Sequence, residues 1–257
     1  MAVVKALVTV AHPDDETFGT GSVIAGLVAG GAHVTVCCAT RGEEGEAPGG
    51  LAEGADLGEV REAELRAAGA VLGVQDFVLL GFRDSGMSGD ADEQTLAGAP
   101  YTEVVRRVSA VLDEVEPSVV VTLGPERGDG HRDHIRIGQA TIAACRDRAD
   151  LRVYAWVVGR EVLRAWFAEL ARMDPDAGHL AMDVDRDDVG WPEDEVSVVL
   201  DSRPYREPRE RAALEHRTQK PPFEGMPTHL QDAFLDTDRL VQVVPPWPGG
   251  PPLTTLL

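Results

Sequence analysis

The chain has 257 residues, with 44 acidic and 24 basic side chains and a formal net charge of −20 at pH 7. This acidic balance argues against nucleic acid and anionic membranes as partners, because both bind through basic surfaces. Hydrophobic residues make up 43% and charged residues 26% of the chain, which is typical of a globular protein and excludes wholesale disorder. The length suits one sizeable α/β domain, alone or with a C-terminal elaboration.

Targeting and anchoring segments are not expected. Apolar runs such as Val34–Ala39 and Val119–Leu123 stop well short of the roughly 20 residues that a bilayer-spanning helix needs. No basic N-terminal region leads into an apolar stretch, so we expect no signal peptide. The three cysteines are too few for a disulfide framework. We therefore expect a cytoplasmic protein, and a homo-oligomer is compatible with the sequence.

The first 160 residues alternate strand-like and helix-like segments. Apolar runs rich in β-branched residues indicate buried strands, and apolar residues at helical spacing indicate helices. The alternation predicts an α/β fold, with a mostly parallel sheet and helices on both of its faces. The predicted strands are Val3–Val10, Val34–Ala39, Phe77–Leu80, Ser118–Leu123 and Leu151–Val158, and the predicted helices are Gly21–Ala29, Leu57–Leu72, Thr102–Val115 and His131–Arg146.

Beyond this core (1–160), residues 161–257 are expected to form a C-terminal elaboration packed on the same domain. The tail from Pro221 to Leu257 is rich in proline, and fits either a segment that wraps the domain or partial disorder. The other expected elements are helices at Val162–Met173 and Pro204–Gln219, a loop at Met182–Glu195 and a strand at Val196–Asp201.

Two segments that carry histidine and carboxylate follow predicted strands. Ala11–Glu16 (AHPDDE) comes after the first strand, and Gly130–His134 (GHRDH) comes after Ser118–Leu123. Because the carboxyl ends of parallel strands meet at one edge of a sheet, we expect the two segments to face each other. Two imidazoles and one carboxylate suit Zn²⁺, with positions left for water and substrate. A nearby carboxylate could then act as the base that activates the water.

The residue pairs within these segments suit a division of roles. Neighbours on an extended turn, such as Asp14 and Asp15, point in different directions, so one can bind a metal while the other faces the water. His131 and His134 share a face of an opening helical turn, so one could bind metal and the other could stabilise an oxyanion, oriented by Asp133. Each segment alone could instead be a turn or a capped helix start. Their occurrence together, after two strands, favours a functional site.

The order of the motifs resembles that of the PIG-L/LmbE-type N-acetylglucosaminyl deacetylase family. The motifs are AHPDDE, TRGEEG, RxxEL followed by LGV, RDSGM and HxDH, all within about residues 3–146, with a weaker HxTQ at His216–Gln219. Arg61 with Glu64-Leu65, and the segment Asp84–Met87, are most similar to the mycothiol-pathway branch, which deacetylates GlcNAc-inositol. The resemblance implies a Rossmann-like, LmbE-like α/β fold that binds no nucleotide.

The resemblance also implies a role for each motif residue and a metal cofactor, Zn²⁺ or else Fe²⁺ or Co²⁺. In this scheme the metal ligands are His12, Asp15 and His134, the general base is Asp14, the group that stabilises the tetrahedral intermediate is His131, the carboxylate that orients it is Asp133, and the substrate-binding residues are Arg61, Asp84 and Met87. Two positions depart from the family pattern. Arg132 stands where the family commonly has proline, and Asp129 stands where the mycothiol branch commonly has tyrosine.

We therefore expect an enzyme, a zinc-dependent de-N-acetylase that hydrolyses the acetamide of a small molecule containing N-acetylglucosamine. A metal-dependent amidase for another N-acyl conjugate, such as a thiol conjugate or natural-product intermediate, would share the same residues. It would differ in the pocket walls, which we expect at Thr40–Asp56, Asp84–Pro100 and Met182–Glu195. A non-catalytic binding module is disfavoured because the base Asp14 and all three ligands are present.

Overall fold

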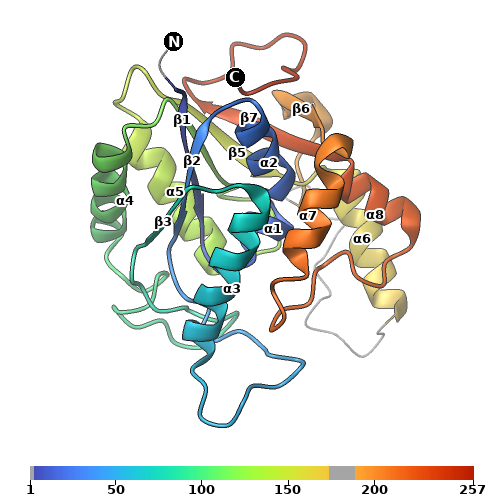
Figure 1. Cartoon of the computed structure of the whole chain (residues 1–257). Helices are drawn as coiled ribbons and strands as arrows, with labels where there is room; N and C mark the ends of the chain where they lie inside the picture. The colour runs from blue at the N-terminus through green and yellow to red at the C-terminus, as the bar shows by residue number, and fades with distance from the viewer. Residues whose placement is uncertain (1–2, 174–188) are drawn as a thin grey trace.

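A seven-stranded sheet forms the centre of the structure (Figure 1). The computed structural model describes residues 3–173 and 189–257 of the chain. Five parallel strands run in the order β3-β2-β1-β4-β5, followed by β7 and β6, and β7 is antiparallel to both of its neighbours. The strands are β1 (Lys5–Val10), β2 (His33–Cys38), β3 (Asp76–Leu79), β4 (Val119–Leu123), β5 (Arg152–Val157), β6 (Val198–Asp201) and β7 (Thr237–Val244).

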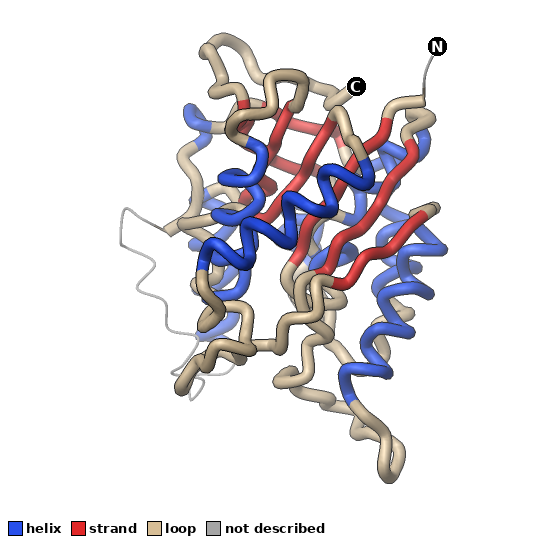
Figure 2. The backbone as a smooth tube through the Cα atoms, turned by 90° about the vertical axis from the view of Figure 1, so that its left-hand side faces the viewer, coloured by secondary structure: helices blue, strands red, loops and turns tan. Residues whose placement is uncertain are grey.

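Helices cover both faces of this sheet (Figures 1 and 2). On one face α4 and α5 pack together against β1, and on the other α2, α3 and α7 pack together. The predicted α/β fold with a mostly parallel sheet is therefore confirmed. The helices are α1 (Asp15–Phe18), α2 (Gly21–Ala29), α3 (Leu57–Leu72), α4 (Tyr101–Val115), α5 (Arg132–Cys145), α6 (Arg160–Met173), α7 (Arg206–Ala213) and α8 (Thr228–Leu235).

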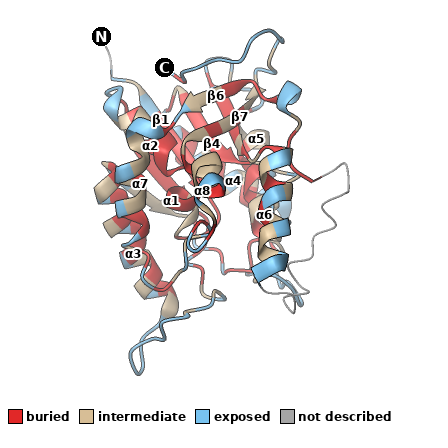
Figure 3. Cartoon of the chain, turned by 90° about the vertical axis from the view of Figure 1, so that its right-hand side faces the viewer, coloured by how far each residue is buried: buried red, intermediate tan, exposed pale blue. Residues whose placement is uncertain are grey.

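The central strands are buried on both sides. Every residue of β4 is buried, and so is every residue of β1 after Lys5. Figure 3 shows these strands as buried layers beneath helices whose outer faces are exposed. Burial on both faces explains why the strands read as unbroken apolar runs, since neither face of a covered parallel sheet meets water.

The tail from Pro221 to Leu257 contains regular structure despite its many prolines. The tail contains α8 and β7, and β7 lies inside the sheet between β5 and β6. In β7 the buried residues Asp238 and Leu240 alternate with less buried ones, as expected for a strand with one covered face. In these two elements the tail therefore packs on the domain.

The helix predicted at Pro204–Gln219 is shorter than expected. A 3₁₀ turn spans Arg203–Tyr205, α7 ends at Ala213, and the chain continues in turns to Gln219. These turns reverse the chain so that His216 and Thr218 become buried, while Leu214 is left exposed. A continued helix would present successive residues around its whole circumference and could not bury both side chains in this way.

Part of the predicted loop at Met182–Glu195 lies outside the described residues. Of the remainder, Trp191 is buried in an apolar cluster with Ala155, Val157 and Val196. The guanidinium of Arg127 lies 4.9 Å from the centre of its ring. Trp191 thus packs the end of the sheet.

A second apolar core joins the C-terminal helices to α1. Its members come from α1, α6, α7, α8 and the segment between α7 and α8, and they are Phe18, Trp166, Ala213, Phe223, Met226, Leu230 and Leu235. Beside this core, the fully buried Arg209 of α7 donates hydrogen bonds to the carbonyl oxygens of Thr17, Phe18 and Gly19. A buried guanidinium therefore caps the carboxyl end of α1, where carbonyl groups lack helical partners.

Replacing Arg209 with methionine should destabilise the fold strongly. The change leaves buried carbonyl groups without donors, so the free energy of unfolding should fall by about 2–5 kcal/mol in urea denaturation. The matched control is Arg211→Met in the same helix, where the side chain is exposed. This control should change the free energy by less than about 0.5 kcal/mol. Equal effects of the two substitutions would contradict the capping role of Arg209.

Candidate active site

Three histidine rings meet where β1 and β4 end. His12 follows β1, and His131 is the residue that precedes the first turn of α5. Because β1 and β4 are paired in parallel, their carboxyl ends lie side by side. The ring centres of His12 lie 4.6 Å from His131 and 5.3 Å from His134, and those of His131 and His134 lie 4.8 Å apart. One nitrogen of each ring lies within 4.8 Å of the others, so the three could share a metal ion.

Carboxylates surround this histidine cluster. Asp15 Oδ1 lies 3.1 Å from Nε2 of His134, and Asp15 Oδ2 lies 3.6 Å from Nδ1 of His12. On the other side of the His12 ring, Nε2 lies 3.3 Å from Asp133 and 3.4 Å from Asp84. Burial alone would lower the pKa of His12, but hydrogen bonds to Asp133, Asp15 and Asp84 raise it well above its ordinary value.

The donor set fits a divalent metal ion. Imidazole nitrogens and carboxylate oxygens are the ligands that Zn²⁺ takes in proteins, and Fe²⁺ and Co²⁺ accept the same atoms. The predicted ligands His12, Asp15 and His134 do come together, since Asp15 contacts both rings. His131 is a further nitrogen donor within reach. Several carboxylates buried close together repel one another, and a bound cation offsets that cost.

Asp14 lies beside this cluster in an unusual backbone conformation. Its φ angle is 131°, a value that residues other than glycine rarely adopt. Its Oδ2 accepts a hydrogen bond of 3.0 Å from Nη2 of Arg61. Burial raises the pKa of Asp14 to about 6, although the charge of Arg61 acts in the opposite direction. A carboxyl group with such a pKa can exchange protons near neutral pH.

Arg61 fastens two loops behind Asp14. It is 3% exposed, and it also donates to the carbonyl oxygens of Gly42 and Pro13, each at 2.7 Å. A Cβ atom at Gly42 or Gly45 would overlap the guanidinium group. The two glycines of the TRGEEG motif are thus explained by the close approach of Arg61 to the backbone.

Asp133 connects the first turn of α5 to the loop after β3. Its carboxylate accepts hydrogen bonds from the N–H of Ser85 at 2.9 Å and from the hydroxyl of Ser85 at 2.5 Å. Its backbone N–H donates to Nδ1 of His131. That bond requires the neutral His131 ring to carry its proton on Nε2. Partial burial, with His12 and His134 nearby, lowers the pKa of His131 to about 4, which favours this neutral form.

The two departures from the family pattern both make specific contacts. Asp129 Oδ2 lies 3.0 Å from Nδ1 of His134, whose Nε2 faces Asp15. Arg132 donates to the carbonyl oxygens of Gly86, Ser88 and Gly89. Asp129 therefore orients His134 in the way that carboxylates orient metal-binding histidines, and Arg132 holds the turn at 86–89.

The remaining predicted residues occupy two kinds of position. Asp84 is 3% exposed and accepts a hydrogen bond from the N–H of Gly86, whereas Met87, on the turn held by Arg132, is 69% exposed. Glu43, in the TRGEEG motif, accepts a hydrogen bond from the N–H of Asp84, so the loop that carries this motif borders the site. Ser85 and Glu16 also contribute contacts here; they lie in the RDSGM and AHPDDE motifs, but the sequence pattern alone indicates no role for either residue.

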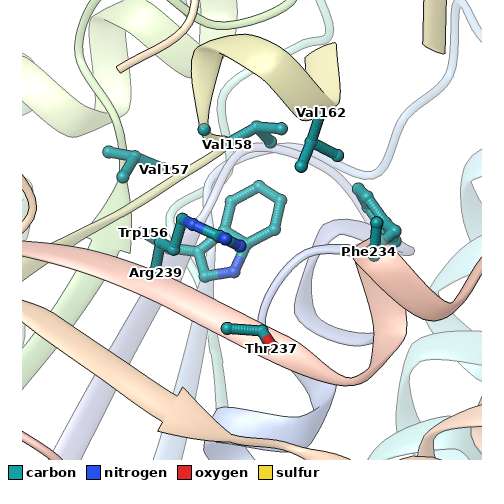
Figure 4. A pocket seen from close by; sticks show the side chains of 9 residues that line it. Trp156, Val157, Val158, Val162, Phe234, Thr237 and Arg239 are labelled. Atoms are coloured by element: carbon teal, nitrogen blue, oxygen red, sulfur yellow. The ribbon is translucent and has the colours of Figure 1, made fainter. Parts of the chain in front are cut away.

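A separate small cavity lies between strands β5 and β7, the start of α6 and the end of α8 (Figure 4). Trp156, Val162 and Phe234 contribute to its lining. Among the described residues, none of the histidines or carboxylates of the candidate site lines this cavity. It therefore adds no group to the candidate chemistry.

Comparison with known proteins identifies the class of enzyme. The family model described as PIG-L, GlcNAc-PI de-N-acetylase, matches residues 7–145, and the chain belongs to this family. The resemblance inferred from the motifs is therefore confirmed, as is the enzyme class, a deacetylase. Within the described ranges 3–173 and 189–257, no helix is both long and apolar enough to cross a membrane.

Individual relatives agree with this assignment. The chain is 37% identical over 271 residues to a protein of Geodermatophilus obscurus named 1D-myo-inositol 2-acetamido-2-deoxy-alpha-D-glucopyranoside deacetylase. The match covers 93% of this chain and 92% of the relative. The chain is 40% identical over 250 residues to a protein of the same name from Saccharomonospora viridis, with coverage of 91% and 90%. The N,N'-diacetylchitobiose deacetylase from Pyrococcus horikoshii shares the fold, with a TM-score of 0.61, 21% identity and coverage of 93% and 83%.

Replacing Arg132 with leucine should loosen the turn at residues 86–89. Three hydrogen bonds are lost, each worth about 0.5–1 kcal/mol, so amide hydrogen exchange in peptides covering this turn should accelerate by about 10- to 100-fold. Mass spectrometry of the exchanged peptides measures the change. Arg146→Leu, just after α5 at its opposite end, is the control and should leave these peptides unchanged. Unaltered exchange in the Arg132 variant would show that the turn holds itself.

Proposed function

We propose that this enzyme removes the acetyl group from the amino nitrogen of N-acetylglucosamine joined to inositol, the compound named for both relatives. The observation that carries the proposal is the meeting of three imidazoles with Asp14 and Asp15 at the ends of β1 and β4. Identities of 37% and 40% over about nine-tenths of both relatives support this substrate. In the reaction water attacks the acetamide carbonyl, the C–N bond breaks, and acetate and a primary amine are released.

In this proposal His12, Asp15 and His134 would hold the metal ion, with Zn²⁺ preferred and Fe²⁺ or Co²⁺ as alternatives. When bound, such an ion supplies Lewis acidity and lowers the pKa of water. Asp15 and His134 are already in contact, and Asp129 orients the His134 ring. These contacts already hold Asp15 and His134 in place, so the fold meets part of the ordering cost of a metal site.

Asp14 and His131 carry the proton and charge chemistry in this proposal. Asp14 takes a proton from the attacking water and later delivers it to the leaving amine. His131 donates from Nε2–H to the oxyanion that develops on the acetamide, because its Nδ1 is engaged by the N–H of Asp133. Asp133 therefore orients His131 through the backbone of α5, and its carboxylate anchors that turn to Ser85.

Arg61, Asp84 and Met87 complete the proposal as the residues that border the sugar. Met87 is exposed on the turn held by Arg132, so it can contact a ligand directly. Arg61 and Asp84 are buried and already bonded to Asp14 and to the loop at residues 84–86. We propose that these two shape the pocket from behind and keep the acetamide aligned with the base.

The test is release of primary amine from a panel of acetylated compounds by the metal-reconstituted enzyme. The panel contains GlcNAc-inositol, free N-acetylglucosamine and an N-acetylated thiol conjugate. The proposal predicts the highest kcat/KM for GlcNAc-inositol. Preference for the thiol conjugate would instead support the alternative amidase. The observation that motivates this alternative is that Asp129 and Arg132 depart from the family pattern. Absence of hydrolysis across the panel would overturn the proposed function.

Substitutions at the two adjacent aspartates separate base from ligand. Asp14→Asn should retain the metal and lower kcat by about 10²- to 10⁴-fold, which is the usual contribution of a general base. Asp15→Ala should lose metal as well as activity, because an anionic ligand is removed. Metal content is measured by elemental analysis alongside kcat. If Asp14→Asn loses metal and Asp15→Ala keeps it, the two roles are exchanged, and full activity of Asp14→Asn would make His131 the leading base.

A further inference from the structure

The backbone of Asp14 needs external support. Its φ of 131° makes it one of three non-glycine residues with positive φ in the described part of the chain. Such conformations cost roughly 1–3 kcal/mol and persist only when surrounding contacts enforce them. The conformation also decides where the Asp14 carboxylate points, because the side chain leaves from the strained Cα atom. The contacts that enforce it therefore position the proposed base.

Both polar ends of the Pro13–Asp14 peptide bond are held by side chains. The carbonyl oxygen of Pro13 accepts a hydrogen bond of 2.7 Å from Arg61. The N–H of Asp14 donates at 2.9 Å to Oε2 of Glu16, whose side chain is fully buried. Because the peptide bond is planar, fixing its two ends fixes its plane, and the φ angle of Asp14 is measured from that plane.

Glu16 is itself held by the C-terminal part of the chain. Its second oxygen, Oε1, accepts a hydrogen bond of 2.6 Å from the hydroxyl of Thr17 and lies 2.7 Å from Nε2 of His216. His216 stands 200 positions later, in the turns that follow α7. These turns are anchored to α3, where Glu64 accepts hydrogen bonds from the N–H and hydroxyl of Thr218.

The environment of His216 indicates that the contact with Glu16, rather than packing, accounts for a histidine at this buried position. The residue is 1% exposed, and among the described residues its Nδ1 has no hydrogen-bond partner. Its ring packs edge-on against Phe18, with centres 5.5 Å apart. Packing alone would be served better by an apolar side chain, since an unpaired buried nitrogen costs about 1–3 kcal/mol. In the part of the chain that the structure describes, the polar contact that offsets this cost is the one with Glu16.

We propose that His216 is a positioning residue for catalysis, which acts on Asp14 through Glu16. By fixing the Glu16 carboxylate, His216 keeps the Pro13–Asp14 peptide in the plane that aims Asp14 at the reacting water. This inference rests on the proposed role of Asp14 as the base. A purely structural ion pair in the core would instead affect stability and leave the alignment of Asp14 unchanged.

Three variants separate positioning from stability. His216→Leu removes the donor to Glu16 and keeps an apolar side chain in the core. His216→Gln places an amide nitrogen the same number of bonds from the backbone as Nε2, so it can restore the donor. Val198→Ala in β6 removes buried volume without touching Glu16 and serves as the control for lost stability. Thermal denaturation identifies conditions in which all three are folded.

For each variant, kcat and KM are measured with GlcNAc-inositol as substrate, and the metal content of the protein is determined separately. We expect His216→Leu to lower kcat by about 10- to 100-fold, because small misplacements of a catalytic group have effects of this size. KM and metal content should change less than about twofold. His216→Gln should recover most of the loss, and Val198→Ala should retain wild-type kcat. A His216→Leu enzyme with wild-type kcat, or one that loses kcat only in proportion to its folded fraction, would overturn the proposal.

Crystal structures of the wild type and His216→Leu give a test that does not depend on activity. The N–H of Asp14 should leave Glu16 in the variant, and Asp14 should relax to a negative φ. An Asp14 conformation identical to that of the wild type would overturn the positioning role. If the wild-type enzyme hydrolyses no compound of the panel, the proposed function fails, while the comparison of the two structures still decides whether His216 controls Asp14.

Discussion

The parallel pairing of β1 with β4 is the constraint on which the rest of the site depends. It brings two chain segments more than 100 residues apart to one edge of the sheet, where His12 meets His131 and His134. Neither segment could hold these imidazoles together alone. The strands themselves are apolar and buried on both faces, so the register that aligns them is enforced by the hydrophobic core. The packing that stabilises the core therefore also fixes the geometry of the site.

The same convergence creates an electrostatic problem. Asp15, Asp84 and Asp133 all lie around His12, in a place largely withdrawn from water. Burying several carboxylates together is unfavourable unless cations or donors compensate them. Part of the compensation comes from N–H groups, such as that of Ser85, and part from the imidazoles. A bound divalent ion would supply the remaining positive charge. The carboxylates that would surround the ion are thus the same groups whose mutual repulsion it would offset.

The sequence was most informative where function needs particular residue types at a strand end. The AHPDDE and GHRDH segments could be placed together because a parallel sheet has only one carboxyl edge. The contribution of the C-terminal part could not be found in this way. The contact between Glu16 and His216 spans 200 positions and depends on where α7 ends, which no local pattern determines. Strand β7 was missed because the prolines around it outweighed its alternation, although those prolines lie outside the strand.

Three arginines show how an acidic chain keeps irregular loops in fixed positions. Arg61, Arg132 and Arg209 each donate to carbonyl oxygens of loops or helix ends near the site. A guanidinium group carries five donors in a rigid plane, so one side chain can hold two or three carbonyls that no secondary structure satisfies. Of the three, Arg61 also contacts a carboxylate of the site, because it donates to Asp14. Because Arg132 rather than the sheet holds the turn at residues 86–89, a change in this turn need not disturb the paired strands that align the histidines.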